Sequence, residues 1–196
     1  MISLQRWKDL AKPGSIVGFS GADLPSDIIN VMTGAWPRWG LSHVGMLAER
    51  DNDLLLFEST TFNHNPCVIQ KKMFSGTQAQ HPLDKIQTYN GRVWIYQPRI
   101  NLREWEKRNL SHYLMNTIGI KYDMIGALRS GGHLFNWMES KLHGENLARI
   151  FCSEWCVAAY NSIERFDTDD DSRWNPNKFI RECKVRAIHL KPVRVK

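Results

Sequence analysis

The chain has 196 residues, of which 42% are hydrophobic and 23% are charged. This length is sufficient for one domain with a hydrophobic core that needs no disulfide bonds, so we expect a single domain over residues 1–196. The balanced composition excludes a disordered chain, and no run of 18 apolar residues predicts a transmembrane segment.

The net charge of +6 is concentrated at the C-terminal end. Residues 181–196 hold six Lys or Arg residues and one acidic residue, Glu182, which is +5 and leaves +1 for the rest of the chain. Such a segment can contact nucleic acid or anionic lipid, or it can be a terminal strand whose basic side chains face solvent. We favour the terminal strand and expect no specific nucleic-acid partner, because no basic surface motif with interleaved aromatic residues accompanies it.

The N-terminus and the cysteines indicate the compartment. The first residues, MISLQRWKDLAKPG, contain acid and base within ten positions and no apolar stretch, so no signal peptide is predicted. The four cysteines (Cys67, Cys152, Cys156 and Cys183) form no C-x-x-C pair. We therefore expect a soluble protein of the cytoplasm or another reducing compartment, with free thiols.

The first half of the sequence predicts mostly β-strands. Residues 50–53 (RDND) are a polar turn between two largely apolar runs, 43–49 and 54–60, which is typical of a β-hairpin. Further strands are expected at residues 15–20, 67–72 and 93–97.

The second half predicts helices. Asn101 is a candidate N-cap for a helix through Leu102–Ile118, with Glu104 at the third position after the cap. A later stripe of apolar residues predicts a second helix with one buried face. The stripe consists of Cys152, Trp155, Cys156, Ala159, Tyr160 and Ile163. Strands followed by helices, without strict alternation, favour an α+β fold with a mainly antiparallel sheet.

Cys152 is a candidate nucleophile. Catalysis by cysteine requires a thiolate, a nearby imidazole and a group that orients the imidazole. As the first residue of the apolar stripe, Cys152 is expected near the start of its helix, where free backbone N–H groups favour a thiolate. Cys156, one turn later, is expected in the core. The alternative is that both are buried structural cysteines, the commonest role of a free cysteine.

The predicted hairpin brings a possible base and orienting group together. If the turn is centred between Arg50 and Asp51, His43 lies opposite Glu58 on the same face of the sheet. A carboxylate beside an imidazole holds the ring and stabilises the imidazolium ion. The alternative is an ordinary cross-strand ion pair on a solvated face, which the apolar neighbours of these two residues argue against.

Several short motifs, taken in order, resemble the circularly permuted papain-like hydrolases. Within the NlpC-type superfamily, the chain looks most like the YiiX/YebB-like branch, in which the histidine strand precedes the cysteine helix. The motifs are the strand after Pro13-Gly14, then Ser42-His43-Val44-Gly45-Met46, Phe57-Glu58-Ser59, Tyr122-Asp123, Phe151-Cys152-Ser153-Glu154 and Asn175-Pro176-Asn177-Lys178-Phe179.

The resemblance implies a role for each matched residue. Cys152 would be the nucleophile, His43 the general base and Glu58 the orienting carboxylate, and Tyr122 would approach the catalytic centre in support. The backbone N–H of Cys152 would contribute to an oxyanion hole. No metal or organic cofactor is implied.

The resemblance also implies a reaction. It is hydrolysis of an amide bond, in a peptide or cell-wall fragment (muropeptide), or of an ester, through an acyl-cysteine intermediate. One alternative is a lipid acyl hydrolase or acyltransferase of the lecithin retinol acyltransferase-like branch, which uses a second histidine in place of Glu58. His64 is available for that role, but its Asn-Pro neighbours predict a loop. The other alternative is a binding module that kept the fold and lost the reaction, against which the presence of all three residue types argues.

Two metal motifs are incomplete. The acidic run 167–171 lacks the glycine and glutamate that a calcium-binding EF-hand loop requires, since Ser172 and Lys178 occupy those positions. His64 and Cys67 have no partner pair at zinc-finger spacing. We interpret the acidic run as a solvated loop and His64 as a loop histidine.

Overall fold

A six-stranded antiparallel sheet with the strand order β4-β3-β2-β1-β5-β6 organises the fold. The computed structural model describes residues 2–21, 40–60, 65–73, 75–121, 144–168 and 174–196. The strands are β1 (Ile16–Gly21), β2 (His43–Arg50), β3 (Asp53–Thr60), β4 (Gly76–Gln80), β5 (Gly91–Tyr96) and β6 (Val193–Arg194). The helices in these ranges are α1 (Leu4–Leu10), α3 (Pro82–Thr88), α4 (Glu104–Asn116), α7 (Gly144–Asn161) and α8 (Pro176–Val185). The α+β class and the antiparallel sheet are therefore confirmed.

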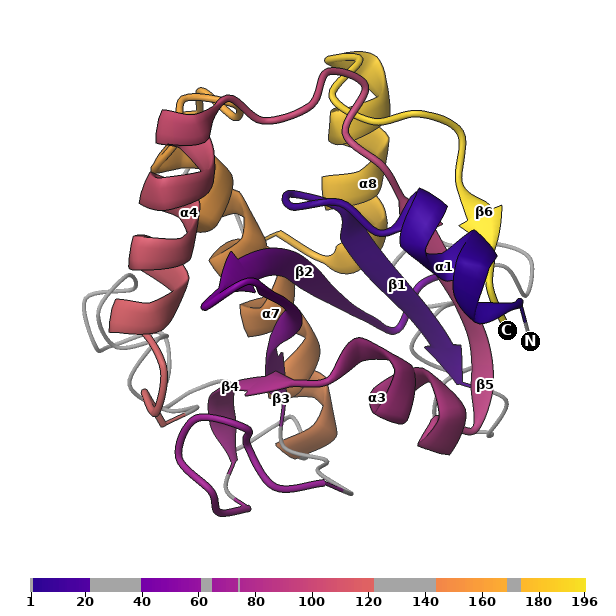
Figure 1. Cartoon of the computed structure of the whole chain (residues 1–196), viewed down its shortest axis with the longest axis vertical. Helices are drawn as coiled ribbons and strands as arrows, with labels where there is room; N and C mark the ends of the chain where they lie inside the picture. Colours follow the sequence, from indigo (N-terminus) through magenta and orange to yellow (C-terminus); the bar gives the residue numbers. More distant parts are fainter. Residues whose placement is uncertain (1, 22–39, 61–64, 74, 122–143, 169–173) are drawn as a thin grey trace.

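Each face of the sheet is covered by helices (Figure 1). On one face, alternate residues of β2 and β3 pack with α4 and α7, and α8 packs against α7. The other face carries a smaller core that includes Trp7 of α1 and Ile86 of α3. The first core includes Val44, Met46, Leu55 and Phe57, and the second includes Val17, Phe19, Leu47 and Leu56. The hairpin is thus covered on both sides beyond its turn, which excludes a solvated face around Glu58, whereas Glu49, Asp51 and Asp53 near the turn are exposed.

The β2–β3 hairpin forms with a different register from the predicted one. Arg50 pairs with Asp53 across a two-residue turn, so Gly45 rather than His43 lies opposite Glu58. The turn residues Asp51 (φ 50°) and Asn52 (φ 67°) are both left-handed, the conformation that two-residue hairpin turns require. The correction moves the register by two positions. Because side chains alternate with a period of two, His43 and Glu58 keep their shared face.

The strand expected at residues 67–72 was wrong, and a strand was missed. Residues 68–72 form turns, with the Lys71 N–H donating to the Cys67 carbonyl oxygen. The missed strand is β4, which pairs with β3 over its whole length and is buried at every residue. Its sequence, GTQAQ, has little of the apolar character by which strands are recognised.

Two helices begin at different residues from those expected. Helix α4 begins at Glu104, and its first turn is closed by the Glu106 carboxylate, which accepts from the N–H of Arg103 at 2.6 Å. Asn101 instead accepts a hydrogen bond from Lys12. Helix α7 begins at Gly144, so Cys152 is its ninth residue and not near its start. The prediction failed there because GENLARI contains several good helix formers that extend the helix backward from the apolar stripe.

The C-terminal segment is part of the fold. Asn175 caps α8 by accepting from the N–H of Lys178, as the Asn-Pro motif indicates. The chain then returns to pair β6 with β5, and Val195 is buried in the second core. The terminal strand expected over residues 181–196 is therefore mostly wrong: residues 181–185 belong to α8, and only Val193–Arg194 form a strand. Among the described helices, none combines the length and apolar character needed to cross a bilayer.

Candidate active site

His43 and Glu58 form a hydrogen-bonded ion pair inside the hairpin. The distance between His43 Nε2 and Glu58 Oε2 is 2.8 Å, with the imidazole N–H donating to the carboxylate. The side chain of Glu58 is fully buried, whereas that of His43 is 13% exposed. His43 is the first residue of β2, and its ring also contacts Phe19 with 5.5 Å between ring centroids. The imidazole is therefore held from two sides.

Cys152 reaches the same imidazole from α7. Its side chain is fully buried in the first core, and it interacts with His43 through a hydrogen bond and through charge. Burial would lower the pKa of His43, but the negative charge of a Cys152 thiolate and the hydrogen bonds with Cys152 and Glu58 outweigh it. Together with the Glu58 charge, they raise the pKa of His43 to about 9. The structure thus joins the Cys152 thiol, the His43 imidazole and the Glu58 carboxylate in one chain of contacts.

Two further residues hold Glu58, and sequence reasoning missed both. Lys85 Nζ of α3 lies 2.8 Å from Glu58 Oε1, and Gln78 Nε2 of β4 donates to the same oxygen at 3.4 Å. Burial would raise the pKa of Glu58, but the charges of Lys85 and His43 and their hydrogen bonds lower it to about 2. A lysine three residues into a short helix gave no sequence signal, and Gln78 lay on the strand that was not recognised.

The backbone that leads into His43 is fixed by side chains from distant elements. The Asn177 amide of α8 makes two hydrogen bonds with Leu41, accepting from its N–H at 2.8 Å and donating to its carbonyl oxygen at 3.2 Å. The Ser42 hydroxyl donates to the carbonyl oxygen of Phe19. These contacts place the first residue of β2 and so limit the positions that the imidazole can take.

Three further residues with sequence-based predictions are Cys156, Tyr122 and His64. Cys156 is buried one turn after Cys152, as expected, and burial together with Cys152 and Cys183 raises its pKa well above the usual range. Tyr122 and His64 lie outside the described residues. The proposed oxyanion contribution of the Cys152 N–H depended on a helix start, which the position of Cys152 inside α7 contradicts. The described residues contain no cluster of three or more His, Cys, Asp or Glu suited to a metal ion.

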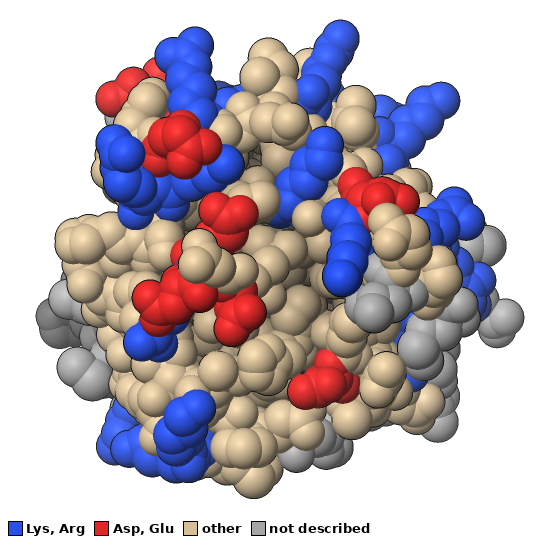
Figure 2. Space-filling view, viewed as in Figure 1, with Lys and Arg blue, Asp and Glu red and all other residues tan. Residues whose placement is uncertain are grey.

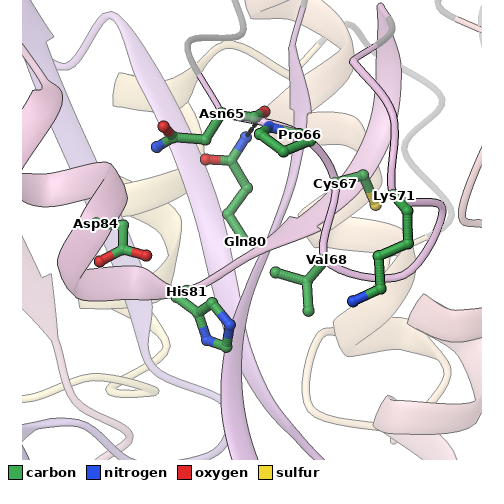
Figure 3. Close-up of a pocket in the computed structure, with 8 residues that line it drawn as sticks. All are labelled: Asn65, Pro66, Cys67, Val68, Lys71, Gln80, His81 and Asp84. Carbon is green, nitrogen blue, oxygen red and sulfur yellow. Dashed lines mark hydrogen bonds between the residues drawn. The ribbon is translucent and has the colours of Figure 1, made fainter.

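A pocket of about 270 Å³ is present among the described residues, and none of Cys152, His43 and Glu58 lines it (Figure 3). It is bordered by the 65–71 turns, the end of β4 and the first turn of α3. Its lining residues are Asn65, Pro66, Cys67, Val68, Lys71, Gln80, His81 and Asp84. Gln80 Nε2 donates to the Asn65 carbonyl oxygen across the upper part of the pocket. Because Asp84 adjoins Lys85 in sequence, α3 contributes both to this pocket and to the contacts of Glu58.

Lys and Arg side chains are spread over the face shown in Figure 2, with Asp and Glu among them. Among the described residues on that face, the basic side chains are interrupted by acidic and uncharged ones, unlike the continuous basic surface that nucleic-acid binding uses.

No protein-family model matches the chain, and no curated protein matches it. Among solved structures, the chain is similar to one described as the metalloprotein YiiX from Escherichia coli O157:H7, DUF1105. The identity is 16% and the TM-score 0.47, over 90% of this chain and 82% of that chain. The likeness is distant, and the chemistry of this chain is therefore inferred from its own side chains.

Proposed function

We propose that the protein is a cysteine-dependent hydrolase of the permuted papain-like type, with Cys152 as nucleophile, His43 as base and Glu58 as orienting carboxylate. The observation that supports this most directly is that His43 contacts both other residues at once, with 2.8 Å between its Nε2 and Glu58 Oε2. Nucleophile, base and orienting group in this sequence of contacts are what covalent acyl transfer requires.

The proposed reaction has two stages. In the first, His43 takes the thiol proton of Cys152, the thiolate attacks the carbonyl carbon of the substrate, and His43 returns the proton to the leaving amine or alcohol. In the second, His43 takes a proton from water, which attacks the acyl-Cys152 thioester. The acid product leaves, and the proton returns to the thiolate. Glu58 stabilises the imidazolium ion in both stages without accepting its proton.

Substrate access is proposed to occur at His43. Of the three side chains, those of Cys152 and Glu58 are fully buried and that of His43 is partly exposed. A peptide or muropeptide amide is the substrate class we propose first, and a lipid ester is the second.

Thiol reactivity tests the proposal without knowledge of the substrate. Iodoacetamide at pH 6.5, with the labelled peptides identified by mass spectrometry, should modify Cys152 before Cys67, Cys156 or Cys183, although all four are buried. His43→Ala should slow the labelling of Cys152, whereas His81→Ala, at an exposed histidine, should not. Equal labelling of the four cysteines, or no effect of His43→Ala, would remove the catalytic interpretation and favour the binding module.

Substrate class is tested by screening peptide, muropeptide and lipid-ester libraries. Cys152→Ala should abolish turnover of any true substrate. Cys156→Ala, one turn later on the same helix, is the matched control and should retain it. Turnover of lipid esters alone would favour the acyltransferase-like alternative.

A further inference from the structure

The two carboxylate oxygens of Glu58 interact with two different basic side chains, His43 and Lys85. Oε2 accepts from His43 at 2.8 Å, while Oε1 lies 2.8 Å from Lys85 Nζ and 3.4 Å from Gln78 Nε2. The side chain of Lys85 is 8% exposed and that of Glu58 is fully buried. Lysine is almost never buried without a partner, so this pairing accounts for the position of Lys85.

The local structure of α3 places Lys85 under the sheet. Pro82 begins the helix and is buried, and Lys85 and Ile86 form its inner surface. Ile86 packs in the second core, the same face on which Leu56 and Glu58 lie. The Lys107–Glu104 pair on α4 is a useful contrast. Glu104 is 77% exposed there, and a pair of that kind contributes little to stability.

The positive charge of Lys85 favours the thiolate form of Cys152, because it balances the charges of the buried cluster. A Cys152 thiolate, a protonated His43, an ionised Glu58 and a protonated Lys85 sum to zero. Without Lys85, the same buried cluster carries one net negative charge, which is costly in a poorly solvated site. The cluster would then bind a proton more readily, and protonation of the Cys152 thiolate would reduce the fraction of Cys152 that is reactive.

We infer that Lys85 is a positioning residue of the active site, which pins one oxygen of Glu58 and supplies the counter-charge that allows Cys152 and His43 to be charged together. This inference rests on the proposed function and assigns a fourth side chain to it. The described titratable groups acting on Glu58 are Lys85 and His43, those acting on His43 are Glu58 and Cys152, and Cys156 lies beside Cys152 on α7.

The test is the pH profile of Cys152 alkylation by iodoacetamide in the full chain, in three variants. Lys85→Met removes a positive charge and should raise the pH midpoint of alkylation by about one unit, which is about tenfold slower labelling below the midpoint. Glu58→Gln removes a negative charge and should move the midpoint in the opposite direction. The double variant restores the charge balance, so its midpoint should lie between those of the two single variants.

A purely structural role for Lys85 predicts a different result. Loss of packing would lower the melting temperature of Lys85→Met and leave the midpoint unchanged, or would move both single variants in the same direction. Either result would overturn the inference. Lys85→Arg keeps the charge and should keep a midpoint close to that of the wild type. Lys107→Met removes a lysine far from the site and serves as the control, and a melting curve for each variant identifies any that do not fold.

The inference and the proposed function can fail separately. If the wild type cleaves no library substrate but the midpoints shift in opposite directions, the proposed function is wrong, and Lys85 is only the counter-charge of the Cys152, His43 and Glu58 cluster. If the wild type cleaves a substrate through Cys152 but Lys85→Met keeps the wild-type midpoint, the function stands and the role of Lys85 is wrong.

Discussion

Acid should destabilise the protein through His189, which lies away from the candidate site. The His189 Nε2 atom lies 2.6 Å from the Tyr160 hydroxyl, which in turn donates to the Gly14 carbonyl oxygen at 2.5 Å. His189 Nδ1 is buried and has no hydrogen-bond partner among the described residues. A neutral ring with its proton on Nε2 fits this arrangement. A second proton on Nδ1 would be a buried donor without an acceptor, which is costly.

The magnitude follows from the pKa difference between the folded and unfolded states. Burial, only partly offset by the nearby Gly14 carbonyl oxygen, lowers the pKa of His189 from 6.5 to about 4. The unfolded chain therefore binds the proton more readily than the folded chain. The stability that the neutral ring contributes is fully present above about pH 6.5 and is lost as the pH falls toward 4. A difference of about 2.5 units corresponds to about 3 kcal/mol.

Urea unfolding measured from pH 7 to pH 4 would test this expectation. The wild type should lose about 2–3 kcal/mol more over this range than His189→Gln, which cannot take up the proton. His112→Gln, at an exposed histidine on α4, should follow the wild type. Glu58 affects stability over a different pH range. Because its pKa is lowered from 4.5 to about 2, the stability that its carboxylate contributes is lost only as the pH falls from 4.5 toward 2. Parallel profiles for the wild type and His189→Gln would refute the reasoning.

Three further predictions concern stability, and chemical or thermal unfolding measures each of them. Asn52→Gly should stabilise the hairpin by about 0.5–1 kcal/mol and Asn52→Ala should destabilise it, because residue 52 has a φ of 67°; equal effects would contradict the turn assignment. Leu114→Ala, at a fully buried position, should cost about 2–5 kcal/mol, whereas Ile100→Ala, 67% exposed, should change stability by less than about 0.5 kcal/mol. Deleting residues 185–196 should lower the melting temperature, because β6 and the buried Val195 are removed; an unchanged melting temperature with weakened salt-sensitive binding would instead indicate a contact segment.

The parts of the fold that the sequence predicted are those with strong local patterns. The hairpin was recognisable because a polar turn separates two apolar runs, and the face shared by His43 and Glu58 depended only on the parity of the register. The exact pairing was not recognisable, since the same residues also allow a turn centred one residue earlier, between Arg50 and Asp51. The left-handed conformation of Asp51 and Asn52 decides between the two centres.

The missed parts of the site depend on tertiary contacts. Gln78 and Lys85 look like surface residues in sequence, because polar side chains are usually exposed. They are buried only because Glu58, on a neighbouring strand, offers a carboxylate to both. The start of α7 was misplaced for a related reason. The apolar stripe marks where the helix is buried, whereas the helix itself continues to Gly144.

The separation in sequence between His43 and Cys152 has a consequence for the order in which the candidate site is assembled during folding. Its pairing with Glu58 spans 15 residues and lies within one hairpin, whereas Cys152 follows His43 by 109 residues and arrives with α7. Contacts between distant segments form late, because the closure of a long loop must first be compensated. We expect the imidazole and carboxylate to be assembled before the thiol reaches them. In a nascent chain, the Cys152 thiol would therefore join His43 and Glu58 only after α7 had left the ribosome and docked on the sheet.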